Sequence, residues 1–225
     1  WRGERGGGPL RDLMGAGLEV ELKLHAETDA PLQALARIER LGPAELGPAR
    51  VVDEVDRYLD APGGPLAAVR WACRLRTREG RTLVSLKGPA QHPAGDGLHR
   101  RPELEGPAGA GLDPGAWPPS EARDLLTRLA GSGPLAERFT LRQRRTERDV
   151  LVAGRRIGTL SLDRVAVTGA DGTEAGSFRA VELELAGSDS DPAPIFESLR
   201  AHPGLVPDPQ TKLERALALL GVEGG

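Results

Sequence analysis

Glutamate recurs at every second position in two short segments of this sequence. "LEVELKL" places Glu19 and Glu21 two residues apart and follows them with Lys23, and "VELELA" repeats the spacing with Glu182 and Glu184. Alternate side chains of a β-strand share one face, so each segment predicts a carboxylate pair on one face and aliphatic side chains on the other. Carboxylate oxygens are preferred ligands of Mg²⁺ and Mn²⁺, and these pairs are therefore candidate ligands for either ion.

Cationic side chains show the same spacing in other segments. The candidates are Arg74 and Arg76 in "CRLR", Lys87 in "LVSLKGP", and Arg142 and Arg144 in "TLRQRR". Guanidinium and ammonium groups bind phosphate oxygens, and the planar guanidinium does so through two parallel hydrogen bonds. A one-residue shift of register exchanges the two faces of a strand, so Arg144 and Arg145 remain alternatives in "RQRR".

The separation of acidic from basic segments predicts how the strands are arranged. Like charges that neighbour one another on a sheet face repel, unless a group of opposite charge lies between them. A closed barrel meets this condition if the charged faces line its lumen and the apolar faces lie outside, beneath helices. The ligand that suits such a lumen is a polyphosphate with a divalent cation, because phosphoryl transfer needs mainly cationic clamps, a metal ion and a positioned water.

Turn-forming clusters divide the chain into an α+β pattern. We expect eight strands, at about 18–25, 50–60, 70–78, 81–88, 98–105, 138–152, 156–167 and 177–186. Helical patterns fit 30–41, 119–130, 192–201 and 209–220. The Gly- and Pro-rich stretch 106–119 predicts a surface connection, and residues 1–17 predict a flexible or tag-like segment before a single domain at 18–221.

Composition excludes several classes of function. The balance of 30 Lys and Arg against 33 Asp and Glu gives a formal charge of −3, so no global basic excess favours nucleic acid or an anionic membrane. The longest apolar runs fall far short of the roughly 20 residues that span a bilayer. Cys73, the single cysteine, excludes an internal disulfide and is expected to be a buried, inert thiol. We therefore expect a cytoplasmic protein.

Several of these motifs together resemble the CYTH superfamily, the triphosphate tunnel metalloenzymes. "ExExK" at Glu19 to Lys23 is similar to the superfamily's N-terminal signature, and "CRLR", "LVSLKGP" and "VELELA" resemble its later strands. "RYLDAPGG" resembles its Tyr-Phe-Asp-Thr-Pro stretch, with Ala61 in place of the threonine. "GLHRRPELE" is similar to the branch of bacterial inorganic triphosphatases, which is often fused to a helical CHAD domain. The resemblance implies an eight-stranded antiparallel tunnel with the triphosphate along its axis.

The resemblance also implies roles for individual residues. It assigns metal binding to Glu19, Glu21, Asp163, Glu182 and Glu184, and phosphate binding to Lys23, Arg74, Arg76, Lys87, Arg101, Arg142 and Arg144. It assigns a direct part in catalysis to Glu19, Glu21, Glu103 and Lys212, the last in the C-terminal segment "QTKLERAL". Lys212 would otherwise be interpreted as a surface lysine of an amphipathic helix.

These observations predict a triphosphatase that uses Mg²⁺ or Mn²⁺ to hydrolyse inorganic triphosphate to diphosphate and phosphate. An adenylyl cyclase, or a thiamine or nucleoside triphosphatase, on the same tunnel is the first alternative. A polyphosphate-binding module without catalysis is the second, although carboxylates beside the cations would weaken pure anion binding. The expected partner is a triphosphate or polyphosphate, and a homodimer or association with a CHAD domain is compatible with the sequence.

Overall fold

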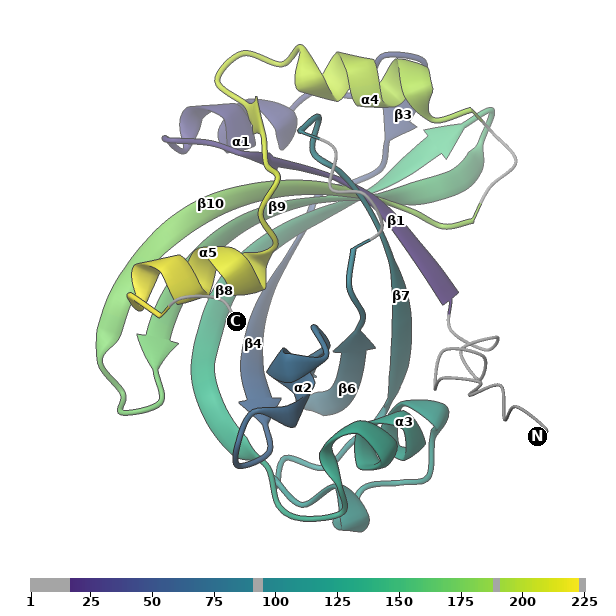
Figure 1. The fold of residues 1–225 in the computed structure, drawn as a ribbon. Helices are drawn as coiled ribbons and strands as arrows, with labels where there is room; N and C mark the ends of the chain where they lie inside the picture. The colour runs from purple at the N-terminus through teal and green to yellow at the C-terminus, as the bar shows by residue number, and fades with distance from the viewer. Residues whose placement is uncertain (1–16, 91–94, 188–190, 223–225) are drawn as a thin grey trace, which may run out of the picture.

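Eight long antiparallel strands form the body of the computed structural model, which describes residues 17–90, 95–187 and 191–222 (Figure 1). The strands are β1 (Gly17–His25), β4 (Arg50–Asp60), β5 (Ala72–Arg78), β6 (Arg81–Lys87), β7 (Leu98–Pro107), β8 (Ala136–Val152), β9 (Arg155–Gly169) and β10 (Glu174–Leu185). The N-terminal segment expected at 1–17 lies outside the described residues, except Gly17, which begins β1.

Hydrogen-bonded pairing closes these strands into a barrel. The order is β8-β4-β5-β6-β7-β1-β10-β9, and β9 pairs with β8 again to complete the ring. Three short strands extend it: β2 (Arg40–Leu41), β3 (Ala44–Leu46), which pairs with β8, and β11 (Val206–Pro207), which pairs with β1. The predicted eight-stranded antiparallel barrel is confirmed.

Five α-helices accompany the strands in the described part of the chain. They are α1 (Ala30–Leu35), α2 (Pro65–Ala68), α3 (Glu121–Ala130), α4 (Ala193–Arg200) and α5 (Lys212–Leu219), with a 3₁₀ turn at Pro114–Ala116. None of these helices has both the length and the apolar composition needed to span a membrane. The four-residue α2 was not predicted, because one helical turn carries no periodic signal.

The outward faces of the strands form two apolar cores under these helices. Leu22, Leu160 and Leu183 pack with Leu32 of α1 and Phe196 of α4 in the first core. In the second, aliphatic residues of β5 and β6 pack with α2, α3 and Trp117. Cys73 lies in this second core, where burial raises the pKa of its thiol to about 12, as expected of an inert cysteine.

Among the described helices, α5 alone packs on the lumenal side of the strands. Ala216 lies in an apolar cluster with Phe139, Leu141 and Val165, whose side chains share strand parity with the charged lumenal positions. Figure 1 shows α5 across the concave side of β8 and β9. Thr211 begins the helix with a capping box, so Lys212 occupies its first turn at the edge of the lumen.

The helix predicted over 30–41 ends at Leu35, because Arg148 of β8 draws the following backbone into another arrangement. The buried Arg148 guanidinium donates to the carbonyl oxygens of Leu35, Ile38, Leu46 and Gly47 at 3.0, 2.5, 2.9 and 2.8 Å. One side chain thus satisfies four carbonyl acceptors of the segment between α1 and β4.

Arg148→Leu should therefore lower the free energy of unfolding by about 2–4 kcal/mol, since several acceptors would be buried without a donor. Urea unfolding followed by circular dichroism measures the change. Arg155→Leu, an exposed position at the start of β9, is the matched control and should change stability by less than about 0.5 kcal/mol. Equal midpoints for both variants would show that these hydrogen bonds contribute little.

Candidate functional site

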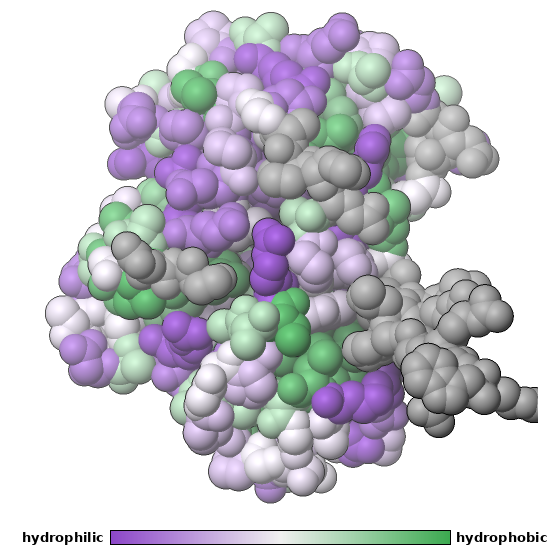
Figure 2. Space-filling view, in the orientation of Figure 1, coloured by the Kyte–Doolittle hydropathy of each residue, from purple (hydrophilic) through white to green (hydrophobic). Residues whose placement is uncertain are grey.

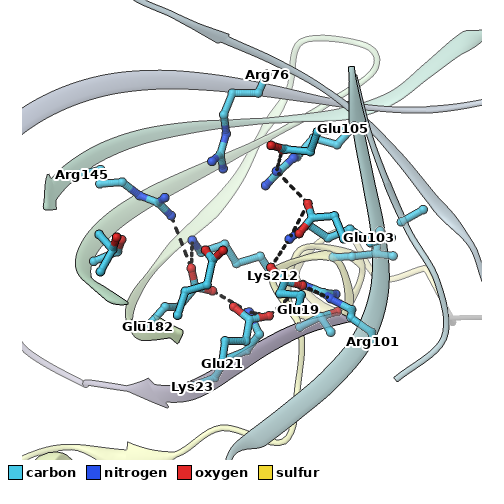
Figure 3. A pocket seen from close by; sticks show the side chains of 18 of the residues that line it. Glu19, Glu21, Lys23, Arg76, Arg101, Glu103, Glu105, Arg145, Glu182 and Lys212 are labelled. Atoms are coloured by element: carbon cyan, nitrogen blue, oxygen red, sulfur yellow. Dashed lines mark hydrogen bonds and ion pairs between the residues drawn. The ribbon is translucent and has the colours of Figure 1, made fainter. Parts of the chain in front are cut away.

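Strand register brings the acidic and basic segments to opposite positions in the lumen. Across β1 and β10, Lys23 lies opposite Glu182 and Glu21 opposite Glu184, while Arg101 of β7 lies opposite Glu19. Figure 3 shows charged side chains from several strands and α5 converging on one space. This cavity has a volume of about 290 Å³.

Nine cations and seven carboxylates of the described residues line the lumen. The cations are Lys23, Arg74, Arg76, Arg78, Lys87, Arg101, Arg145, Arg156 and Lys212, and the carboxylates are Glu19, Glu21, Glu103, Glu105, Glu147, Glu182 and Glu184. Every predicted site residue therefore lines the lumen except Asp163, Arg142 and Arg144.

Glu19 is the centre of the first ion-pair cluster. It accepts from Lys87 Nζ at 2.5 Å and from Arg101 Nε at 2.7 Å, and Arg101 also donates to Glu21 at 2.9 Å. Burial by itself would raise the pKa of Glu19, but the charges of Lys87, Arg101 and Lys23 hold it well below its ordinary value. Glu19 is thus ionised and held in place by two β-strands.

Glu182 is the centre of the second cluster, drawn in Figure 3. It accepts from Lys23 Nζ at 2.7 Å and Lys212 Nζ at 2.8 Å, and Arg145 approaches to 3.4 Å. Despite burial, the charges of Lys212, Lys23 and Arg145 lower the pKa of Glu182 well below its usual range. Lys212 of α5 therefore joins the site, as the resemblance to the superfamily implied.

Asp163 lies behind this cluster and does not face the cavity. It is fully buried and accepts from Arg145 Nε at 2.8 Å and from Lys212 Nζ at 2.6 Å. Burial opposes ionisation, but the charges of Arg145 and Lys212 lower the pKa of Asp163 below its ordinary value. As placed, Asp163 orients two lumenal cations.

A third ion-pair cluster is centred on two carboxylates of β4, Glu54 and Asp56. They were not identified from the sequence. Asp56 accepts from Arg76 at 2.7 and 2.8 Å and from Gln143 at 2.6 Å, while Glu54 accepts from Arg78 at 3.1 Å. Both carboxylates are at most 1% exposed. The period-two spacing of "VVDEVDRYLD" was the available signal.

The structure overturns the prediction that Arg142 and Arg144 face the lumen. Both are exposed on the outer wall, and Arg145 and Gln143 point inward instead. The prediction assumed that the apolar face of every strand lies outside. In β8, however, Phe139 packs on the lumenal side under α5. The odd-numbered residues of this segment therefore face the lumen, and the even-numbered Arg142 and Arg144 face outward.

Two lumenal carboxylates carry charge that the described cations do not fully balance. Glu184 forms no ion pair with any described residue, and burial together with the charges of Glu19 and Glu21 raises its pKa. Burial likewise raises the pKa of Glu103, although Lys87 Nζ lies 3.1 Å away. A hard cation would relieve the repulsion between Glu21 and Glu184, which lie directly opposite one another.

The donor set therefore fits a divalent ion, but the described residues contain no preassembled group of three metal-ligating side chains. Glu19, Glu21 and Glu182 are each paired with lysine or arginine. A metal ion would bind by exchange with some of these pairs.

Comparison with known proteins identifies the family. The CYTH domain model matches residues 17–217, so the chain belongs to the CYTH family. No curated protein matches the chain.

Three solved structures share the fold. HpAC1 from Hippeastrum, an adenylyl-cyclase-like protein described with a dominant triphosphatase activity, is 19% identical, with a TM-score of 0.66 and coverage of 91% of this chain and 97% of that one. An adenylate-cyclase-like protein from Bacillus halodurans is 20% identical, with a TM-score of 0.57 over 88% and 98% of the two chains. A Pyrococcus horikoshii protein is 21% identical, with a TM-score of 0.51 over 89% and 98%.

Charge compensation in the lumen predicts opposite effects for two glutamates on β10. Without metal at neutral pH, Glu184→Gln should stabilise the fold by less than about 0.5 kcal/mol, because it removes like-charge repulsion that solvent partly screens at this exposed position. Glu182→Gln should destabilise it by about 3–5 kcal/mol, because buried cations lose their partner. Thermal unfolding in EDTA measures both changes.

The effect of Glu184→Gln on stability should depend on pH, because the pKa of Glu184 is raised in the folded state. Protonated Glu184 stabilises the fold below the pKa of the unfolded chain, and this contribution is lost as pH rises through the folded-state pKa. The gain from Glu184→Gln should thus be present at neutral pH and vanish in acid. Destabilisation by Glu184→Gln at neutral pH would contradict this assignment.

Proposed function

We propose that this CYTH protein is a divalent-metal-dependent triphosphatase that hydrolyses inorganic triphosphate to diphosphate and phosphate inside the barrel. The observation that carries the proposal is one lumen in which cations from six strands and α5 surround carboxylates of β1, β7, β8 and β10. Such a lumen binds several phosphates of one linear anion at once, because its cationic donors are distributed over the wall.

The charge balance of the lumen supports a requirement for a metal ion. The carboxylates nearly compensate the cations, so triphosphate alone would bring a large negative charge into a neutral cavity. Glu19, Glu21, Glu182 and Glu184 would hold Mg²⁺ or Mn²⁺. When bound, the ion would supply Lewis-acid polarisation of a phosphoryl group and lower the pKa of water.

The protein's own side chains orient the substrate and manage a proton. In the proposal, Lys87, Arg74 and Arg76 hold phosphate oxygens so that water attacks the terminal phosphorus in line with the departing diphosphate. Glu103 accepts the proton of that water, a role suited to a buried carboxyl whose pKa is raised. Lys212 stabilises the negative charge that develops during bond cleavage.

Removal of a clamp should affect turnover differently from removal of a metal ligand. Lys87→Ala should lower kcat/KM for inorganic triphosphate by about 10- to 150-fold, mainly through KM, because one charge-assisted contact is lost. Glu21→Gln should reduce mainly kcat. Phosphate release with Mg²⁺ or Mn²⁺ measures both effects.

The control for these variants is Arg128→Ser, which removes an exposed charge of α3 and should leave kinetics unchanged. Full activity in EDTA would refute metal dependence. An unchanged KM in a folded Lys87→Ala protein would refute its role as a clamp.

A second candidate, an organic triphosphate as substrate, is favoured by a cavity that joins one end of the lumen. This cavity of about 760 Å³ shares Tyr58, Lys87 and Arg101 with the lumen and extends past Trp71 to Ala67 of α2. Figure 2 shows hydrophobic side chains beside hydrophilic ones on the face between α5 and α2. Apolar and aromatic walls beside a phosphate site suit a nucleoside or thiamine group.

Ala67→Trp separates the two candidates, because it fills the larger cavity without entering the shared part. Phosphate release from inorganic triphosphate, ATP and thiamine triphosphate should be compared, with cyclic AMP assayed in the ATP sample. If inorganic triphosphate is the substrate, Ala67→Trp should leave its kcat/KM unchanged. A loss confined to ATP or thiamine triphosphate would support the second candidate.

Ala68→Trp is the matched control, since Ala68 is exposed on the same helix and does not line the cavity. If no triphosphate is hydrolysed although inorganic triphosphate binds, the protein is a polyphosphate-binding module and the proposal fails.

A further inference from the structure

A second cationic surface lies on the outer wall of the barrel, separate from the lumen. Arg144 of β8, Arg164 of β9 and Arg179 of β10 occupy directly opposite positions on three neighbouring strands. Arg142 lies two residues from Arg144 on the same face. These four arginines line an open groove of about 510 Å³, which we call the outer groove.

Carboxylates in the described part of the chain form ion pairs with only two of these four arginines. Asp29, before α1, accepts from Arg164 at 3.0 Å and from Arg179, and so holds both guanidinium groups in place. Asp53 lies opposite Arg144 in the register, but the two form no ion pair. Arg142 likewise has no ion pair with any described residue.

Among the described residues, the outer groove therefore has four cations against two carboxylates whose side chains face it. The third acid along it, Glu54, turns its side chain into the lumen, where it pairs with Arg78. Like charges on directly opposite strand positions destabilise a sheet. An excess of two positive charges in a concave surface creates a local field that attracts an anionic ligand.

We propose that the outer groove is a second anion site that binds condensed phosphate. Adjacent strands lie about 4.8 Å apart, so the three aligned guanidinium groups extend over about 10 Å. A short linear chain of phosphates can contact several guanidinium forks along such a row at once. Asp29 orients two of these forks, while Arg142 and Arg144 supply unpaired donors. The site does not depend on hydrolysis in the lumen.

Binding in the absence of a metal ion tests the proposal without turnover. Calorimetric titration with inorganic tripolyphosphate in EDTA, where the lumen lacks the metal ion that it is proposed to require, should show binding to the outer groove of the wild-type protein. Arg142→Ser combined with Arg144→Ser should weaken this binding by about tenfold or more per lost contact. Arg100→Ser combined with Arg128→Ser removes two exposed charges elsewhere and should preserve it.

A chemical measurement locates the second site in the unmodified protein. Phenylglyoxal, which reacts with accessible arginines, should modify Arg142 and Arg144 less when tripolyphosphate is present, as read by peptide mass spectrometry. Arg100 and Arg128 should react equally with and without it. Long-chain polyphosphate, tested in parallel, shows whether the groove also accepts part of a longer chain.

Several outcomes would overturn the proposal. They are no tripolyphosphate binding to the wild-type protein in EDTA, equal losses in the two double variants, or no protection of Arg142 and Arg144. Protection by single-stranded RNA or an acidic peptide but not by tripolyphosphate would assign the groove to another class of ligand and reject condensed phosphate. A protein that binds tripolyphosphate at the outer groove but hydrolyses nothing with Mg²⁺ or Mn²⁺ would refute the triphosphatase alone.

Discussion

Charge compensation inside the barrel is the constraint on which the rest of the structure depends. A buried ion is costly unless partners of opposite charge and hydrogen bonds surround it. Here Glu19 is held by Lys87 and Arg101, and Glu182 by Lys23 and Lys212, each pair joining different strands or α5. The ion pairs therefore join parts of the barrel that are distant in sequence and keep the lumen charged.

The same ion pairs orient the lumenal cations before any ligand binds. The carboxylates pair with the cations around the cavity, so a phosphate chain, the ligand that we propose, would meet donors that are already oriented. Glu184 is left without an ion pair among the described residues and lies opposite Glu21, so one part of the wall favours a cation. A metal ion and a triphosphate would thus compensate each other as they enter.

Helix α5 sets the limits of that site. Its apolar face covers Phe139, Leu141 and Val165, so the lumen is charged only where this cover ends. Its first residue, Lys212, reaches both Asp163 and Glu182. One helix therefore closes part of the barrel with hydrophobic packing and completes the charged cluster with a cation.

Strand β8 carries arginines to both sides of the wall. Arg145 points into the lumen and is fully compensated by Asp163 and its neighbours, whereas Arg142 and Arg144 point outward and have no ion pair with described residues. Both surfaces are rich in arginine, but the lumenal arginine is paired with a carboxylate of the described residues and these two outer arginines are not. The outer groove is therefore proposed as a ligand site separate from the lumen.

The sequence alone determined the strands and most of their inward faces, because period-two alternation is a local property of an extended chain. It placed Glu19, Glu21, Glu182, Glu184, Arg74, Arg76 and Lys87 on the lumenal face, and resemblance added Arg101, Glu103 and Lys212. Only the tertiary structure decided three features: which residues of "RQRR" face the lumen, where α1 ends, and that Asp163 lies behind two cations. Each depends on contacts between distant segments: α5 on Phe139, Arg148 on the carbonyls after α1, and Arg145 with Lys212 on Asp163. No local pattern specifies which distant segment covers a strand face, so only the assembled barrel could determine these positions.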